Sequence, residues 1–200
     1  MKKTFLHLIA AVLLLSPSAA LAASQNADDL PSGTYALDKK HTSVTAKVRH
    51  MGVSLFVVRF NTFDASFTYD KARPEAASVT ASVDTASLDA GADYSSKFAE
   101  EFLAASKFPK ITFVSREVRR TEPNRGTMTG DLTLRGVTKP VTWDVTFVGT
   151  GKWVLPPFNT IAGFTATTTI KRSDFGSTFL NNGIVGDDVT LTIESEFDRK

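Results

Sequence analysis

The sequence of 200 residues contains no cysteine. The chain therefore forms neither a disulfide bond nor a thiolate metal site, and its stability must come from packing and hydrogen bonds. It also lacks an excess of charge of one sign, since 23 Lys and Arg stand against 21 Asp and Glu. A charge balance this close to zero gives no reason to expect a nucleic acid as partner.

Histidine is scarce as well, with three residues in the chain. His41 and His50 stand apart, and neither has an Asp or Glu beside it at the spacing of a metal-binding motif. Because a metal site needs at least three converging ligands, the sequence predicts none. It also lacks a Gly-x-Ser-x-Gly elbow, a phosphate-binding loop and a dinucleotide fingerprint. No catalytic residue and no cofactor are therefore predicted.

Apolar runs long enough to span a bilayer, which takes about 20 residues, are also missing. The short run Leu6–Leu15 follows Lys2 and Lys3 and is followed by the small-residue site Ala20–Ala22. This order is that of a secretory signal peptide. We therefore expect residues 1–22 to be cleaved, and the chain to reach the bacterial periplasm without stable membrane insertion. Cleavage would leave 21 basic and 21 acidic residues, a formal charge of zero.

The part that follows has the length of one domain. Residues 23–33 are polar and end in Pro31–Gly33, which predicts a flexible leader. Residues 34–200 show no shift in composition that would mark a second domain. They are numerous enough to bury a sizeable core.

From residue 34 onward, the main pattern is an alternation of apolar and polar residues. It is clear in residues 44–50, 63–70, 79–84, 141–147, 164–170 and 189–197, and less regular in 111–118 and 127–135. Neighbouring side chains on a strand point to opposite faces, so each segment presents one apolar face that must be buried. About eight such strands, joined by Gly, Pro and Asn turns, predict an antiparallel barrel or sandwich.

One segment breaks this alternation. Between Asp93 and Lys107, Phe98 and Phe102 lie four positions apart, on one face of a helix. Pro109 follows and is expected to stop the helix. The spacing predicts one amphipathic helix inserted between strands.

Phenylalanine is abundant, with 15 Phe against 3 Tyr and 2 Trp. Most of these residues lie on the apolar faces of the predicted strands. A small closed barrel either fills its interior with such side chains or holds one small ligand. The residues themselves leave both options open, but the few polar groups among them favour an apolar ligand if one is bound.

Six motifs in order along the chain resemble the YceI-like family of lipocalin-like periplasmic proteins. They are Tyr35–Asp38 with His41–Val44, His50–Ser54, Ser87–Gly91, Phe108–Phe113, Gly130–Pro140 and Arg172–Gly176. The resemblance covers nearly all of the chain from Gly33 to Phe197, and the motif Gly130–Pro140 is the most specific piece. It implies an all-β fold with one inserted helix, an antiparallel up-and-down lipocalin-like β-barrel around an apolar channel.

The resemblance also implies a function, namely the non-enzymatic binding and transport of a polyisoprenoid lipid, such as an isoprenoid quinone or a polyprenol derivative. Each buried methylene contributes about 0.8 kcal/mol, so several isoprene units could supply a micromolar affinity of about 8 kcal/mol. The residues expected to line the channel are Phe60, Phe63, Phe67, Phe98, Phe102, Phe113, Trp143, Phe147 and Phe164.

Two alternatives stay open at this point. The first is a stress-protection or interaction module whose barrel is packed solid. The second is an enzyme that acts on a bound isoprenoid with His41 or His50 as acid–base group. The exposed surface of a sheet is also compatible with a homodimer.

Overall fold

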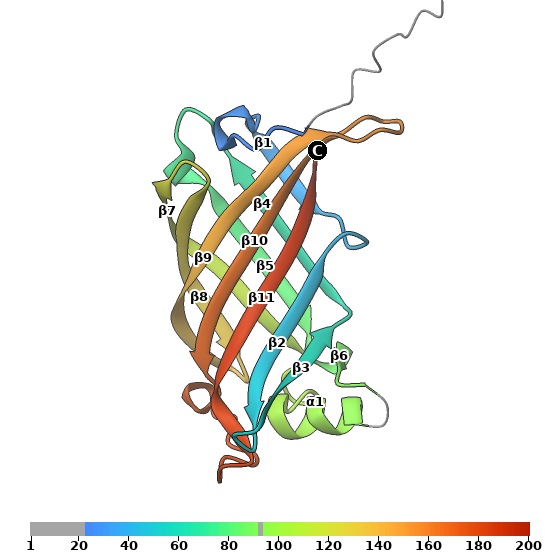
Figure 1. The fold of residues 1–200 in the computed structure, drawn as a ribbon, viewed down its shortest axis with the longest axis vertical. Coiled ribbons are helices and arrows are strands. Elements are labelled where there is room, and N and C mark those ends of the chain that lie inside the picture. The colour runs from blue at the N-terminus through green and yellow to red at the C-terminus, as the bar shows by residue number, and fades with distance from the viewer. Residues whose placement is uncertain (1–22, 92–93) are drawn as a thin grey trace, which may run out of the picture.

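The computed structural model describes residues 23–91 and 94–200, and its strands wrap into a barrel (Figure 1). The strands are β1 (Gly33–Leu37), β2 (Ser43–His50), β3 (Ser54–Phe60), β4 (Phe63–Tyr69), β5 (Ser78–Asp84), β6 (Leu88–Asp89), β7 (Lys110–Glu122), β8 (Arg125–Leu134), β9 (Val137–Lys152), β10 (Thr160–Lys171) and β11 (Val185–Arg199). The helical elements are α1 (Ser95–Leu103) and the 3-10 turns η1 (Ala27–Asp29), η2 (Pro74–Ala76), η3 (Thr85–Ser87) and η5 (Arg172–Phe175). The predicted signal peptide, residues 1–22, lies outside the described residues.

The barrel closes through eight strand positions, because three short strands continue their neighbours along the chain. β2 continues β1, β4 continues β3, and β6 continues β5, each after a short break. β1 pairs with both β4 and β11 and so closes the ring, while β2 pairs with β11 and β3. Neighbours around the ring therefore follow sequence order and are antiparallel, which confirms the predicted up-and-down barrel.

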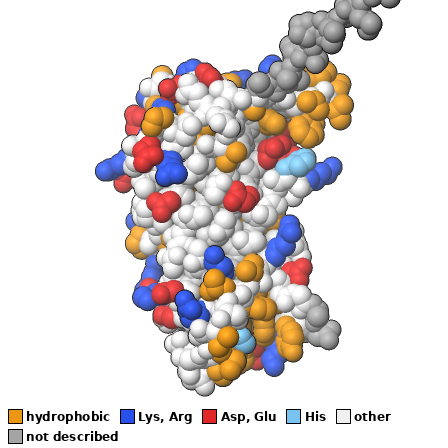
Figure 2. All heavy atoms as spheres, in the orientation of Figure 1, with side chains coloured by type: hydrophobic (Ala, Val, Ile, Leu, Met, Phe, Trp, Pro, Cys, Tyr) orange, Lys and Arg blue, Asp and Glu red, His pale blue; other side chains and the backbone are white. Residues whose placement is uncertain are grey.

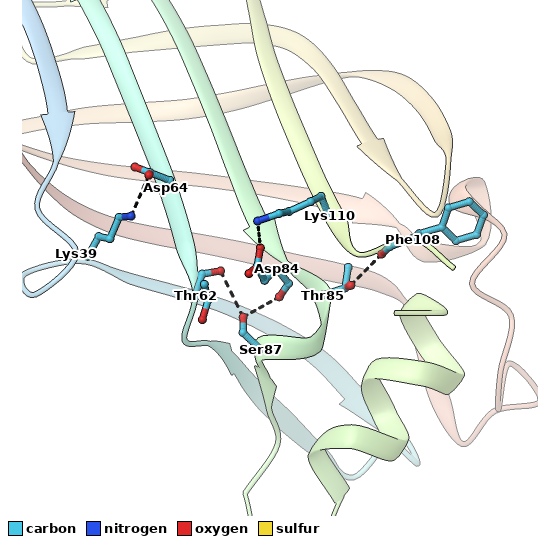
Figure 3. Close-up of polar contacts among 8 residues, drawn as sticks. All are labelled: Lys39, Thr62, Asp64, Asp84, Thr85, Ser87, Phe108 and Lys110. Atoms are coloured by element: carbon cyan, nitrogen blue, oxygen red, sulfur yellow. Dashed lines mark hydrogen bonds and ion pairs between the residues drawn. The ribbon is translucent and has the colours of Figure 1, made fainter. Parts of the chain in front are cut away.

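The breaks between these strands are held by polar contacts (Figure 3). The hydroxyl of Ser87 in η3 donates to the carbonyl of Asp84 at 2.7 Å, and that of Thr85 donates to the carbonyl of Phe108 at 2.8 Å. Lys110 pairs with Asp84 across β5 and β7. These contacts fix the point where the chain leaves β5, forms β6 and enters the helical segment.

The helix α1 lies at one end of the barrel, beside η3 and β6 (Figure 1). It is shorter than the sequence predicted and ends at Leu103, several residues before Lys107 and Pro109. The cause is Ala104, which adopts a left-handed conformation with φ of 50° and donates its N–H to the carbonyl of Glu100 at 2.8 Å. A left-handed residue ends a helix without proline. Among the described residues, no helix is long and apolar enough to cross a membrane.

The other end of the barrel is covered by the segment for which the sequence predicted a flexible leader. Residues 23–33 instead carry η1 and pack against the barrel. Ser24 exchanges two backbone hydrogen bonds of 2.8 Å with Thr150 of β9, and Leu30 is 4% exposed. Leu30 is buried because it caps the apolar interior. We call the two ends of the barrel the η1 end and the α1 end.

Large apolar side chains also remain on the outside, and Figure 2 shows them gathered in two places. One group is Val154, Leu155 and Phe158 in the connection between β9 and β10. The other is Met51, Val53 and Leu55, where β2 turns into β3 at the α1 end.

Candidate functional site

The barrel interior contains two cavities of about 460 Å³ and about 490 Å³. The first lies toward the η1 end and the second toward the α1 end, and we name them after these ends. Both are lined mainly by the inward-facing apolar residues of the alternating strands. The interior is therefore not packed solid, whereas the stress-protection or interaction module considered as an alternative was expected to have a solid core.

The η1-end cavity has an aromatic wall. Phe67 lies at its centre, with ring centroids 5.5 Å from Phe164 and 4.9 Å from Phe197 in edge-on contacts. On its other face Phe67 stacks on Tyr35 at 4.5 Å. Edge-on and stacked rings hold each other in place. Rings from β1, β4, β10 and β11 therefore pack against one another at this wall.

The α1-end cavity is lined by aromatic residues from the helix and from β3. The Phe98 ring contacts Phe102 at 5.4 Å and Phe56 at 6.2 Å between centroids, and Tyr94 stacks on it at 5.4 Å. Phe98 and Phe102 therefore share a helix face, as their spacing predicted, and that face closes this end of the barrel. The helix is thus part of the cavity wall.

All nine aromatic residues predicted to line a channel line one of the two cavities. Phe63, Phe67, Phe113, Trp143, Phe147 and Phe164 line the η1-end cavity, and Phe60, Phe98 and Phe102 line the α1-end cavity. Their placement inside the barrel follows from the alternation of each strand. Their contact with a ligand stays a prediction.

The two cavities lie end to end along the strands. On β2, Val44 lines the η1-end cavity and the next inward residue, Ala46, lines the α1-end cavity. On β11, Ile193 lines the η1-end cavity and Leu191 lines the α1-end cavity. One inward step along a strand thus separates the two spaces.

Charged residues lie at the two ends of the barrel. At the η1 end the rim includes Arg119, Arg120 and Arg125. Arg120 forms an ion pair of 2.6 Å with Asp28, which lowers the pKa of the Asp28 carboxyl and ties η1 to the hairpin of β7 and β8. At the α1 end the rim includes His50. A head group at either end of the barrel would therefore meet charged or hydrogen-bonding side chains.

Arg172, in η5, lines the α1-end cavity. It is 4% exposed, and its guanidinium donates to the carbonyls of Ser177, Phe179, Val185 and Gly186 at 2.8–2.9 Å. It also lies over the Phe102 ring, 5.5 Å from the centroid. Burial lowers the pKa of this guanidinium. Its role is to hold the segment that follows η5 across the α1 end.

Some lining residues were missed. Phe56 and Phe197 lie at inward positions of β3 and β11, so the alternation of apolar and polar residues in these strands could have identified them. Tyr94, Leu180 and Ile184 belong to connections, where no period indicates direction. Only the folded chain brings these connections over the cavity.

The indole nitrogen of Trp143 is buried and has no hydrogen-bond partner among the described residues. Trp143 is 4% exposed and packs edge-on against Phe113 at 6.0 Å. A buried donor without an acceptor costs free energy. Its large ring nevertheless buries much apolar area in the middle of the barrel.

The two histidines lie in different surroundings. His41 is on the outer surface and lines neither cavity, whereas His50 is at the rim of the α1-end cavity. The expectation that no carboxylate accompanies His41 was wrong. Its Nδ1 lies 2.8 Å from Asp38 and 3.8 Å from Glu196, because the turn after β1 and strand β11 bring them together. An acid–base role for His41 on a ligand inside the barrel has no geometric support.

A closed antiparallel barrel with a helix at one end and apolar cavities inside defines the lipocalin-like class. The sequence profile of the YceI-like domain matches residues 35–197. A UPF0312 protein of Pseudomonas putida strain W619 is 41% identical over 180 residues, which cover 88% of each chain. The chain therefore belongs to the YceI-like family.

Solved structures have the same fold. Burkholderia cenocepacia BcnA is 26% identical with a TM-score of 0.72, and the match covers 80% of this chain and 98% of that one. A Campylobacter jejuni YCEI protein is 28% identical with a TM-score of 0.67, over 77% and 91% of the two chains. A polyisoprenoid binding domain from Saccharophagus degradans matches with a TM-score of 0.60 at 13% identity, over 83% and 98%. At that identity the likeness shows the fold alone.

Proposed function

We propose that this protein binds an amphiphilic polyisoprenoid, such as an isoprenoid quinone or a polyprenol derivative, and carries it through the periplasm without altering it chemically. The observation that carries the proposal is the pair of apolar cavities placed end to end inside the barrel. Their walls are mainly apolar, and Arg119, Arg120 and Arg125 lie at the η1-end rim and His50 at the α1-end rim, which suits a long apolar tail with a polar head.

Energetics support a tail of this kind. Burying about 15 tail carbons, the content of three isoprene units, contributes about 12 kcal/mol at 0.8 kcal/mol for each methylene. A micromolar complex needs about 8 kcal/mol, and the ordering of the tail consumes the difference. Membership of the YceI-like family and the name of the Saccharophagus domain agree with such a ligand. Export through cleavage after residue 22 would place the protein where such a carrier is useful.

Two measurements test the proposal. Organic extraction of the protein purified from its native host, followed by mass spectrometry, should release an isoprenoid. Ubiquinone added to lipid-free protein should quench the fluorescence of Trp143, which lies in the cavity wall. Trp153→Phe would remove the second tryptophan and isolate this signal.

Cavity-filling variants sharpen the test. Ala166 lines the η1-end cavity and Ala46 the α1-end cavity, so Ala166→Phe and Ala46→Phe should each weaken ubiquinone binding. Ala72→Phe on an exposed turn is the matched control and should bind as the wild type does. No extracted isoprenoid together with no quenching, or equal binding by all variants, would refute the proposal.

A homodimer also stays a prediction. Met51, Val53 and Leu55 are exposed next to the rim of the α1-end cavity and give an apolar surface for it. Sedimentation velocity over a range of concentrations would decide the oligomeric state.

A further inference from the structure

Three potential metal ligands meet on the outer surface of the barrel, away from both cavities. They are Asp38 in the turn after β1, His41 just before β2, and Glu196 near the end of β11. One ligand atom from each lies within 4.8 Å of the other two. The Nδ1 atom of His41 is 2.8 Å from Oδ2 of Asp38 and 3.8 Å from Oε1 of Glu196.

The positions of these residues are set by the backbone. The N–H of Asp38 donates to the carbonyl of Glu196 at 2.8 Å, and the Thr42 hydroxyl donates to the carbonyl of Asp38 at 2.7 Å. The same hydroxyl accepts the N–H of Glu196 at 3.3 Å. The turn is therefore attached to β11, and the three side chains are brought together before any ligand arrives.

One atom of the group is left unsatisfied. The Oε1 atom of Glu196 is closed off from solvent and has no hydrogen-bond partner among the described residues. His41 Nδ1 already pairs with Asp38 and is too far from Glu196 for a second hydrogen bond. A cation between the three residues would remove this deficit.

The donor set selects the kind of cation. An imidazole with two carboxylates suits Zn²⁺ and its neighbours Ni²⁺ and Cu²⁺ better than Ca²⁺ or Mg²⁺, which prefer oxygen ligands alone. Tetrahedral Zn²⁺ with bonds of about 2.0–2.1 Å places its ligands about 3.3–3.4 Å apart. The two separations from His41, 2.8 and 3.8 Å, bracket that value, and the three ligand atoms all lie within 4.8 Å of one another, so side-chain shifts of about an ångström would form the site. The His41 side chain is 47% exposed, which leaves room for water as a fourth ligand.

We propose that Asp38, His41 and Glu196 form a surface binding site for a divalent transition-metal ion, with Zn²⁺ as the best fit. The site is separate from the lipid cavities, and it does not depend on the function proposed for them. Because it joins the turn after β1 to β11 at the point of barrel closure, bound metal would also stabilise the closed barrel.

The structure supplies a local reporter for this site. The rings of Trp153 and His41 have centroids 5.5 Å apart. Cu²⁺ bound at His41 should therefore quench Trp153 fluorescence, whereas Trp143 lies inside the barrel. ZnCl₂ titrated into untagged protein by calorimetry should show one bound ion per chain, and CuCl₂ should show saturable quenching with the same stoichiometry.

Variants identify the ligands. His41→Ala, Asp38→Asn and Glu196→Gln should each weaken Zn²⁺ binding by about tenfold or more, since each removes a ligand or its charge. His50→Ala, the other histidine of the barrel, should leave binding unchanged. Trp153→Phe should abolish the quenching and keep the calorimetric binding.

Circular dichroism of each variant would show that the barrel still folds. Glu196→Gln and Asp38→Asn are close in size to the native residues, so the test does not depend on His41→Ala folding. The proposal fails if wild-type protein binds no Zn²⁺ in the micromolar range. It also fails if His50→Ala weakens binding as much as His41→Ala, or if Glu196→Gln and Asp38→Asn bind as tightly as the wild type.

Discussion

Replacing Arg172 by Met is expected to destabilise the barrel by about 3–5 kcal/mol, the cost of breaking a buried charged network. The Arg172 guanidinium satisfies four backbone carbonyls of the segment that follows η5. A hydrogen bond from a charged group contributes about 1.5–3 kcal/mol, so the four bonds set an upper bound of about 6–12 kcal/mol. Part of this is recovered, because the freed carbonyls can turn toward water at the barrel end.

Urea unfolding followed by circular dichroism measures this effect. Thermal unfolding gives a second measure. In a domain of this size each kcal/mol shifts the Tm by about 2–4 °C, so the Tm of Arg172→Met should lie about 6–20 °C below that of the wild type. Arg172→Lys keeps the charge but cannot reach several carbonyls at once, and an intermediate loss is expected. The segment after η5 should also become more sensitive to limited proteolysis in both variants.

Arg116→Met is a matched control. Arg116 is exposed and pairs with Asp131 at 2.6 Å on the outside of the barrel, where ion pairs contribute about 0–1 kcal/mol. If Arg172→Met lowered the free energy of unfolding by no more than Arg116→Met does, the reasoning about the buried carbonyls would be refuted.

Three further predictions concern the core, a close backbone contact and pH. Phe67→Ala removes the ring at the centre of the aromatic wall and should lower the free energy of unfolding by about 3–5 kcal/mol in urea titrations; a loss below about 1 kcal/mol would contradict it. Gly130→Ala would place a Cβ against the carbonyl of Val114 and the neighbouring Phe113 ring, and should cost about 1–3 kcal/mol in the same assay; unchanged stability would show that β7 can move away. Hydrogen bonding to Asp38 raises the pKa of His41 in the folded protein above its value in the unfolded chain. The contribution of His41 to the free energy of unfolding is therefore fully present below the unfolded pKa and is lost as the pH rises through the folded pKa. The gap in stability between the wild type and His41→Ala should therefore narrow from about pH 5 to about pH 9, and a gap that widens would reverse this assignment.

The strands were predictable because burial on one face imposes a period of two. In β9, apolar residues alternate with polar ones, and the apolar residues face the interior of the barrel: Val141, Trp143, Val145 and Phe147. The helix was predictable from the spacing of Phe98 and Phe102, but its end was not. Left-handed Ala104 has no marker in the sequence, whereas Pro109 suggested a later stop.

The residues of the candidate sites also fall into a group that the sequence predicted and a group that it did not. Lining residues on strands were predicted, while lining residues in connections, such as Tyr94 and Leu180, were not. The ligands of the proposed metal site were missed because Glu196 lies more than 150 positions from Asp38 and His41. Spacing along the chain carries no information about contacts that closure of the barrel creates.

The absence of cysteine, the alternating strands and the excess of phenylalanine were sufficient to determine a disulfide-free antiparallel barrel or sandwich with phenylalanine on its apolar faces, and the family resemblance pointed to the barrel. Composition can be counted directly in the sequence, and the alternation is a local property, because a strand needs only its own pattern to define a buried face. Whether the interior was full or hollow depended on how side chains from eight strand positions meet around one axis. The contacts of Arg172, and the meeting of His41 with Glu196, likewise arise between segments that approach one another only when the barrel closes. Such distances are set by tertiary packing, and tertiary structure alone decided them.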